Sequence, residues 1–242
     1  MTLQPITRQS IPDEIFAQLA GQVLSGDRTP GDTLPSERTL SEALGVSRAA
    51  VREALGRLDR ARLIQVRQGG STVVRDFRAE AGFDVLPLLL VHGGDVDRAT
   101  LAGLVEARAI IGPQVAALAA ARATDDARTR LRAMVDELEA ESEPVQRMWR
   151  ALAFWELIVD SAESIAFRLL FNTLNQAYVP ALDALVNVMA AEVTEIEHYR
   201  SLTEAIAVGD QRGARLAAAA LLDLGSAAFA ELANQLEDRN DA

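Results

Sequence analysis

The sequence predicts a mainly α-helical protein, in which a short N-terminal domain with a β-hairpin precedes a larger all-helical bundle. Three observations support this prediction. Apolar residues recur at helical spacing over most of the chain, strand-like segments are confined to residues 63–74, and charge is distributed unevenly between the two parts. With 242 residues and an apolar share of 49%, the chain is long enough for two modest domains and too apolar to be disordered.

Three helices and a hairpin are predicted for the N-terminal part. Apolar side chains recur at helical spacing in three segments, and two short segments typical of strands flank a glycine-rich turn. The helices are expected over residues 10–25, 37–44 and 48–61, and the strands over 63–66 and 72–74. Ser36 and Ser47 stand where N-caps belong, and Gly45 separates the second helix from the third. This order of elements is that of a winged helix-turn-helix.

Helical spacing continues from about residue 86 to the C-terminus, while strand signals disappear. Six or seven helices are expected, over residues 95–122, 125–142, 144–159, 163–192 with a bend at Pro180, 193–208 and 210–236. Together these patterns predict a winged helix-turn-helix domain over residues 1–77, a linker over 78–84 and an all-α helical bundle over 85–242.

Charge separates the two predicted domains. Residues 1–77 carry ten basic and nine acidic side chains, whereas the rest of the chain carries fourteen basic and twenty-six acidic ones, and every basic residue is arginine. The phosphates of a nucleic acid would repel the acidic part but not the near-neutral part. The asymmetry therefore indicates two domains with different partners.

Several classes of protein are disfavoured. Without cysteine the chain has neither a disulfide framework nor a thiolate site, and its two histidines lie far apart in the sequence. No glycine-rich phosphate loop follows a predicted strand, so we expect no enzyme activity. No run approaches the roughly 20 apolar residues of a membrane span, and the N-terminus lacks the pattern of a signal peptide. We therefore expect a cytoplasmic protein with no membrane partner.

The start of the third predicted helix has the composition of a helix that reads DNA. Arg48 and Arg52 lie one turn apart, and each can place a guanidinium against a guanine edge or a phosphate. Ala49 and Ala50 between them permit close approach and can touch thymine methyl groups. Ser47 and the helix N-terminus offer hydroxyl and amide donors to a phosphate. The alternative is an ordinary solvated face, which explains any one arginine better than it explains the set.

Two further features fit the same surface. Arg38, at the start of the second helix, can reach the DNA backbone or an adjacent base. Gly69 and Gly70 leave the hairpin tip without side chains, so the tip can enter the minor groove with Arg67 and Gln68 beside it. The sequence therefore predicts binding to double-stranded DNA.

The segment PGDTLPSERTLSEALGVSRAAVREAL, from Pro30 to Leu55, resembles the DNA-binding signature of GntR-type bacterial repressors. The resemblance implies operator contacts at Arg38, Ser47, Arg48, Arg52, Gln68 and Gly69. Ala49 and Ala50 occupy positions of the same surface where that family often has Thr or another polar residue. The resemblance also implies a homodimer that reads the two halves of a palindromic operator with paired recognition helices.

One charged residue interrupts an apolar stripe in the helical part. The stripe consists of Leu101, Leu104, Ile111, Val115 and Leu118, and Arg108 falls on it. A guanidinium that faces a core needs a partner, because an unpaired buried charge is very unfavourable. Two partners are compatible with the sequence, namely an anionic ligand or a carboxylate on another helix.

The helical part is similar to the effector domain of the FadR subfamily of GntR regulators, in residues 104–108, 116–121, 154–164 and 199–210. Many of those relatives hold a divalent metal with an Asp and three His. The matching positions here are Ala151, Trp155, Tyr199 and Leu221. These side chains are poor metal ligands, and His198 stands one place away from the matching position, so we expect neither a metal nor a cofactor.

Apolar and aromatic residues at those positions predict a ligand pocket. Arg108, Trp155 and Tyr199 are the predicted ligand-binding residues, and they suit an effector with an apolar part and one acidic group. The namesake branch of the subfamily lacks the metal and binds long-chain acyl-CoA, so the resemblance implies a fatty acid or an acyl-CoA. Trp155 and Tyr199 can equally be core aromatics. A sensor of small carboxylates, such as a sugar acid or hydroxyacid, and a DNA-binding protein without a ligand remain alternatives.

Overall fold

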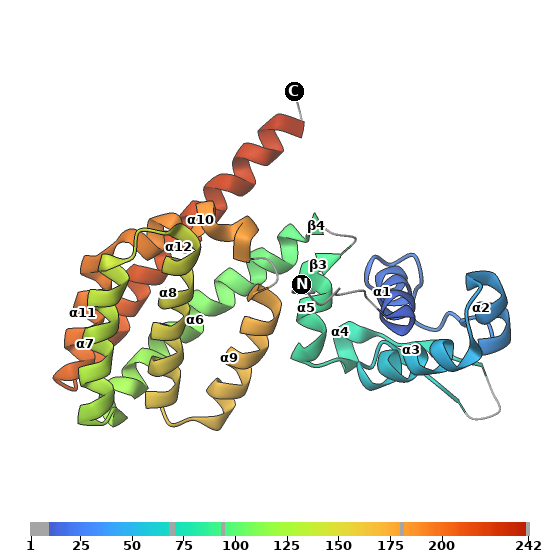
Figure 1. Cartoon of the computed structure of the whole chain (residues 1–242), viewed down its shortest axis with the longest axis horizontal. Helices are drawn as coiled ribbons and strands as arrows, with labels where there is room; N and C mark the ends of the chain where they lie inside the picture. Colours follow the sequence, from blue (N-terminus) through green and yellow to red (C-terminus); the bar gives the residue numbers. More distant parts are fainter. Residues whose placement is uncertain (1–9, 68–70, 93–94, 180–181, 241–242) are drawn as a thin grey trace, which may run out of the picture. The chain divides into compact units, whose positions relative to one another are not determined.

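The computed structural model describes residues 10–67, 71–92, 95–179 and 182–240 (Figure 1). The chain divides into two compact units, Met1–Asp95 and Val96–Ala242. Each unit has its own core, and we describe the two units separately.

The first unit begins with the predicted winged helix-turn-helix. Its elements are α1 (Ile11–Leu24), α2 (Glu37–Leu44), α3 (Arg48–Arg60), β1 (Ile64–Gln65) and β2 (Val73–Val74). The two strands are antiparallel, and Ile64 is opposite Val74. The predicted order of helices and strands is confirmed.

Serine side chains begin all three helices. The Ser10 hydroxyl accepts a hydrogen bond from the backbone N–H of Asp13, and the Asp13 carboxylate accepts one from the backbone N–H of Ser10, which forms a capping box. Ser36 and Ser47 accept the same kind of bond at the starts of α2 and α3. Gly45 ends α2 in the left-handed region, with φ of 66°, which glycine adopts without steric strain. These local signals set the tight turn between α2 and α3.

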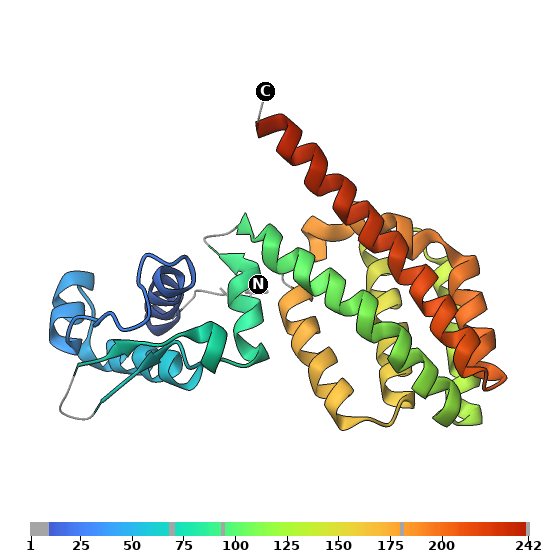
Figure 2. The ribbon, with the colours of Figure 1, turned by 180° about the vertical axis from the view of Figure 1, so that it is seen from behind.

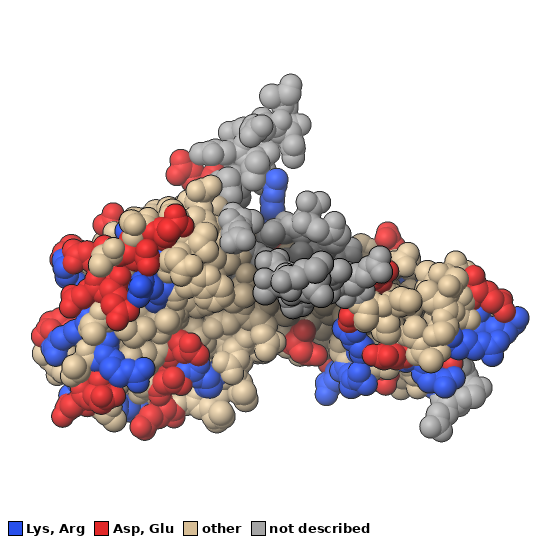
Figure 3. Space-filling view, viewed as in Figure 1, with Lys and Arg blue, Asp and Glu red and all other residues tan. Residues whose placement is uncertain are grey.

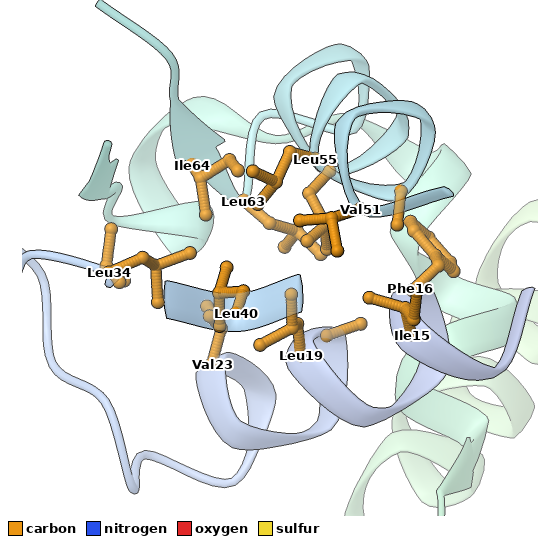
Figure 4. Packing of buried hydrophobic residues seen from close by; sticks show 14 of the residues in the cluster. Ile15, Phe16, Leu19, Val23, Leu34, Leu40, Val51, Leu55, Leu63 and Ile64 are labelled. Atoms are coloured by element: carbon orange, nitrogen blue, oxygen red, sulfur yellow. The ribbon is translucent and has the colours of Figure 1, made fainter. Parts of the chain in front are cut away.

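The core of the first unit gathers side chains from α1, α2, α3 and the hairpin (Figure 4). Val51, Leu58, Leu63 and Ile64 are completely buried there. Because the inner face of α3 is fixed in this way, its opposite face is held towards the solvent.

The segment after the hairpin contains more structure than the sequence predicts. It forms α4 (Phe77–Glu80), a 3-10 turn η1 (Phe83–Val85), α5 (Leu86–Leu90), β3 (Val91–His92) and β4 (Asp95–Val96). The expectation that strands are absent beyond residue 86 was therefore wrong. Val85 and the partly buried Leu88 and Leu89 pack against the core of the first unit, a contact that helical spacing alone does not reveal. The expected linker over 78–84 and the boundary at residue 85 remain predictions.

The second unit is a bundle of helices. They are α6 (Arg98–Arg122), α7 (Asp125–Ala140), α8 (Pro144–Ser161), α9 (Ile165–Tyr178), α10 (Leu182–Thr194), α11 (Ile196–Ala207) and α12 (Gln211–Asn240). Helices α6 and α12 lie side by side and run in opposite directions (Figure 2). The segment predicted as one helix over 163–192 forms two helices, and the predicted bend at Pro180 lies outside the described residues.

Two helices of this unit, Arg98–Arg122 and the Gln211–Glu231 part of α12, are long and apolar enough to cross a membrane by length and composition alone. In the structure they pack against each other. A core helix of a globular domain satisfies the same test. Both helices contain completely or almost completely buried residues, among them Val115 and Ala116 of α6 and Ala218 and Leu221 of α12.

Candidate functional site

The N-terminus of α3 is exposed to solvent. It is part of the predicted DNA-binding surface, for which we use the term reading surface. Ser47, Arg48 and Ala49 are exposed, and the hydroxyl of Ser47 accepts a hydrogen bond from the backbone N–H of Ala50 over 3.2 Å. Ala50 is half-buried and packs against the core, and Val51 is completely buried. The exposed face is therefore narrow and small, as close approach to a DNA groove requires.

Arg52 makes a forked ion pair with Glu37 of α2. Its Nε lies 3.1 Å from Oε1 and its terminal nitrogen 2.8 Å from Oε2 of that carboxylate, while the Arg52 side chain stays 71% exposed. The hydrogen bonds from Arg52 lower the pKa of Glu37, with a smaller contribution from the charge of Arg48. The pair joins α2 to α3 and gives Arg52 a partner in the absence of DNA.

Arg38 also has a carboxylate partner, since its guanidinium lies 3.2 Å from Glu42 one turn further along α2. Arg48 forms no ion pair with any described side chain. In Figure 3, arginine side chains lie at the end of the first unit that carries α2, with acidic side chains beside them. Gln68 and Gly69, the predicted contacts from the hairpin tip, lie outside the described residues.

The second unit contains a cavity of about 130 Å³ between α6, α8, α9, α10 and α12. Its wall is apolar for the most part, and includes Leu101, Leu104, Val105, Ile111, Met148, Leu152, Phe167, Leu170, Phe171, Leu174, Met189 and Leu222. The polar groups in the wall are supplied by Arg108, Glu192, Asn175 and Trp155. An apolar cavity with a few convergent polar groups is the usual form of a small-molecule site.

Arg108 reaches the cavity, and its guanidinium is bound to Glu192 of α10. The two terminal nitrogens lie 3.0 Å and 2.6 Å from the two carboxylate oxygens, and the Glu192 side chain is only 3% exposed. Burial raises the pKa of Glu192, against the opposing effect of the Arg108 charge. Of the two partners left open by the sequence, the structure contains the carboxylate on another helix.

Trp155 and Tyr199 occupy different environments. Trp155 lines the cavity, and its Nε1 is buried without a hydrogen-bond acceptor among the described residues. Tyr199 is completely buried and packs edge-on against Phe154, with ring centroids 5.2 Å apart, but it is not part of the cavity wall. Its position therefore matches the alternative of a core aromatic.

The positions that carry metal ligands in related proteins do not fit a metal here. Ala151 and Trp155 belong to the cavity wall, and Leu221 is completely buried, so none of these three offers a metal donor. His198 is half-buried on α11. Within the part of the chain that the structure describes, no group of three or more His, Cys, Asp or Glu side chains could hold an ion.

Sequence reasoning missed three features of these sites. Glu192 is the one charged residue in the mostly apolar segment 185–193, and this is a signal that could have identified it. The Arg38–Glu42 pair has the i,i+4 spacing of helical ion pairs and was equally detectable. Glu37, fifteen residues before Arg52, gave no such signal.

Two protein-family profiles match the chain, one in each unit. The profile of the gntR family of bacterial regulatory proteins matches residues 12–74, and the profile of the FCD domain matches residues 103–224. The HTH-type transcriptional regulator Mce2R of Mycobacterium tuberculosis is 47% identical, over 93% of this chain and 94% of its own length. The fatty acid metabolism regulator protein of Vibrio vulnificus is 39% identical, over 38% of this chain and 33% of its own length.

Among solved structures, the chain is similar to Lar, which controls the expression of the Listeria monocytogenes agr system. The match covers 94% of this chain and 100% of that one, with a TM-score of 0.60 and 17% sequence identity, and supports the fold alone. The family profiles and the relative with 47% identity establish more than the fold. The chain belongs to the GntR family of bacterial transcriptional regulators, which are not enzymes, and it has an N-terminal helix-turn-helix domain and a C-terminal FCD domain.

Proposed function

We propose that this regulator is a cytoplasmic homodimeric repressor, which binds a palindromic operator and changes its affinity for DNA when an apolar effector enters the cavity of the second unit. The observation that carries the proposal is the cavity itself, whose wall is apolar apart from Arg108, Glu192, Asn175 and Trp155. A wall of this kind selects against strongly hydrated molecules, because their polar groups would be left without partners.

The operator-binding part of the proposal rests on the N-terminus of α3. Ser47, Arg48 and Ala49 form a narrow exposed face, and Arg48 is free of ion pairs with described residues. We infer that Arg48 contacts a guanine edge or a phosphate directly, whereas Arg38 and Arg52 must first exchange their carboxylate partners for DNA.

A fatty acyl group is the effector that we favour. The fatty acid metabolism regulator of Vibrio vulnificus, named above, is a partial relative. An apolar cavity of about 150 Å³ in another protein takes up benzene, so the 130 Å³ here accommodates an apolar group of about that size. A longer acyl chain would have to separate the surrounding helices. Such a separation would give the ligand the differential affinity for two conformations that regulation requires.

The test is a titration of the protein with a fluorescent fragment of its own upstream DNA. The effectors are acyl-CoAs of increasing chain length, with sugar acids and hydroxyacids as a second panel. We expect an acyl compound to change the operator affinity at least about tenfold, which corresponds to about 1.4 kcal/mol of coupling. If only the hydroxyacids changed the operator affinity, the effector would be a small carboxylate and not an acyl compound.

A cavity-filling variant provides the control for this titration. Ala151→Leu adds bulk to the cavity wall, whereas Ala121→Leu adds the same bulk at an exposed position of α6. We expect Ala151→Leu to weaken the response to the effector and Ala121→Leu to retain it, with operator affinity in the absence of effector unchanged in both. An equal response in the two variants would place the effector outside the cavity.

A further inference from the structure

We propose that Glu192 determines which head group the cavity accepts: by occupying Arg108 it makes the site select neutral acyl derivatives, such as esters, thioesters or amides, over free carboxylates. This inference rests on the proposed function, because it assumes that an acyl group binds in the cavity. The inference concerns the head group of the acyl ligand, which contacts the polar residues of the cavity wall.

The geometry of the ion pair supports this assignment. Both terminal nitrogens of Arg108 are engaged by the two oxygens of Glu192, at 3.0 Å and 2.6 Å, which is the fork geometry that a ligand carboxylate would itself adopt. Glu192 therefore already fills the position that a fatty acid would need. Arg108 and Glu192 together present a pair of opposite charges to the cavity, so the wall offers no net attraction to an anion.

The packing around the pair holds Glu192 in place. A Cβ atom on Gly225 of α12 would lie 2.3 Å from Oε2 of Glu192 and 3.0 Å from Cε of Met189. The carboxylate thus fits into space that only a glycine leaves open, between α12 and the rest of α10. The backbone of α12 at Gly225 therefore limits movement of the carboxylate in that direction.

Displacement is also unfavourable electrostatically. A ligand carboxylate that took over Arg108 would leave the buried Glu192 carboxylate uncompensated, and one that bound beside the pair would meet a like charge. A neutral head group avoids both penalties. Its carbonyl oxygen needs only a hydrogen-bond donor, and the wall contains the amide of Asn175 and the buried Nε1 of Trp155, which lacks an acceptor among described residues.

The experiment compares octanoic acid with methyl octanoate, which share one acyl chain and differ in charge. The readout is the fluorescence of Trp155 in a Trp149→Phe background, since the chain has two tryptophans and this change leaves one. Dissociation constants are measured at pH 8 for this reference protein and for its Glu192→Gln variant. The quantity compared is the change in the acid-to-ester ratio from the reference protein to Glu192→Gln, which cancels the intrinsic difference in hydrophobicity between the two ligands.

We expect the reference protein to bind the ester at least tenfold more tightly than the acid, and Glu192→Gln to shift the ratio at least tenfold towards the acid. Glu195→Gln, which removes an exposed carboxylate three residues away, should leave the ratio unchanged. An acid that binds the reference protein as tightly as the ester, or a ratio that Glu192→Gln does not shift, would overturn the inference.

Two further measurements keep the outcomes separate. If neither ligand binds while operator DNA does, the acyl-effector part of the proposed function fails, and the inference fails with it. If Glu192→Gln does not fold, as far-UV circular dichroism would reveal, the Arg108→Gln/Glu192→Gln double variant replaces it. Because that variant also removes the cation, we expect it to retain the preference for the ester, and a preference for the acid would contradict the role of the pair.

Discussion

The backbone of Gly225 lies directly against the carboxylate of Glu192. A Cβ atom at this glycine would stand 2.3 Å from Oε2 of Glu192 and 2.7 Å from a terminal nitrogen of Arg108. The ion pair between α6 and α10 is therefore enclosed by a third helix, α12, and three segments far apart in the sequence determine one feature of the cavity wall.

Gly225→Ala should destabilise the second unit by about 1–3 kcal/mol, because the added methyl group forces apart a closely packed ion pair. Gly103→Ala is the matched control, since Gly103 also lies within a helix and a Cβ there meets no atom within 4 Å. That change should stabilise the protein by about 0.5–1 kcal/mol through helix propensity. Urea denaturation measures both, and equal effects of the two changes would contradict the close packing at Gly225.

Arg48→Ala should weaken operator binding by about 1–3 kcal/mol and relax the preference for one base pair. The side chain is exposed, so thermal stability should not change. Arg130→Ala removes the same charge from an exposed position of α7 and should leave operator affinity intact. Fluorescence anisotropy with operator DNA and a shuffled sequence measures both variants. An equal loss of affinity for the two DNAs would instead indicate that Arg48 contacts a phosphate.

Asp13 should titrate well below an ordinary aspartate. Hydrogen bonds from Ser10 and from Arg57 lower the pKa of Asp13 to about 2. Because the folded pKa lies below the unfolded value, the interactions of the carboxylate stabilise the fold above about pH 4, and this contribution is lost as the pH falls towards 2. Carboxyl-selective NMR measures the titration directly. Arg57→Ala should raise the midpoint, and a midpoint near 4 in the unmodified protein would contradict the contacts.

The two tryptophans should differ in their accessibility to a quencher. Trp149 is 41% exposed, whereas Trp155 is 9% exposed in the cavity wall. Acrylamide should therefore quench the fluorescence of the Trp155→Phe variant, which retains Trp149, several-fold more efficiently than that of Trp149→Phe. Similar quenching constants for the two variants would show that the cavity admits solvent freely.

Much of the fold could be predicted because its signals are local. Ser36, Ser47 and Gly45 each act through hydrogen bonds or backbone torsions within a few residues, so the ends of α2 and α3 can be read from the sequence. The helices of the second unit follow the same apolar spacing and, except where α9 and α10 replace one expected helix, begin and end close to the expected residues. Among the elements that were missed, η1 and α5 depend on the packing of Val85, Leu88 and Leu89 against the core of the first unit.

The candidate sites also combine features that the sequence predicts with features that depend on tertiary packing. By itself the sequence determined the family, the order of the elements, the exposed arginines of the reading surface and the need of Arg108 for a partner. Only the tertiary structure decided that this partner is Glu192, eighty-four residues further along the chain, that Arg52 pairs with Glu37, and that Trp155 lines the cavity while Tyr199 does not. The physical reason is that helical spacing fixes which side chains share a face. Which face meets which neighbour depends on how each helix is rotated and packed, and that is settled by contacts between segments far apart in the sequence.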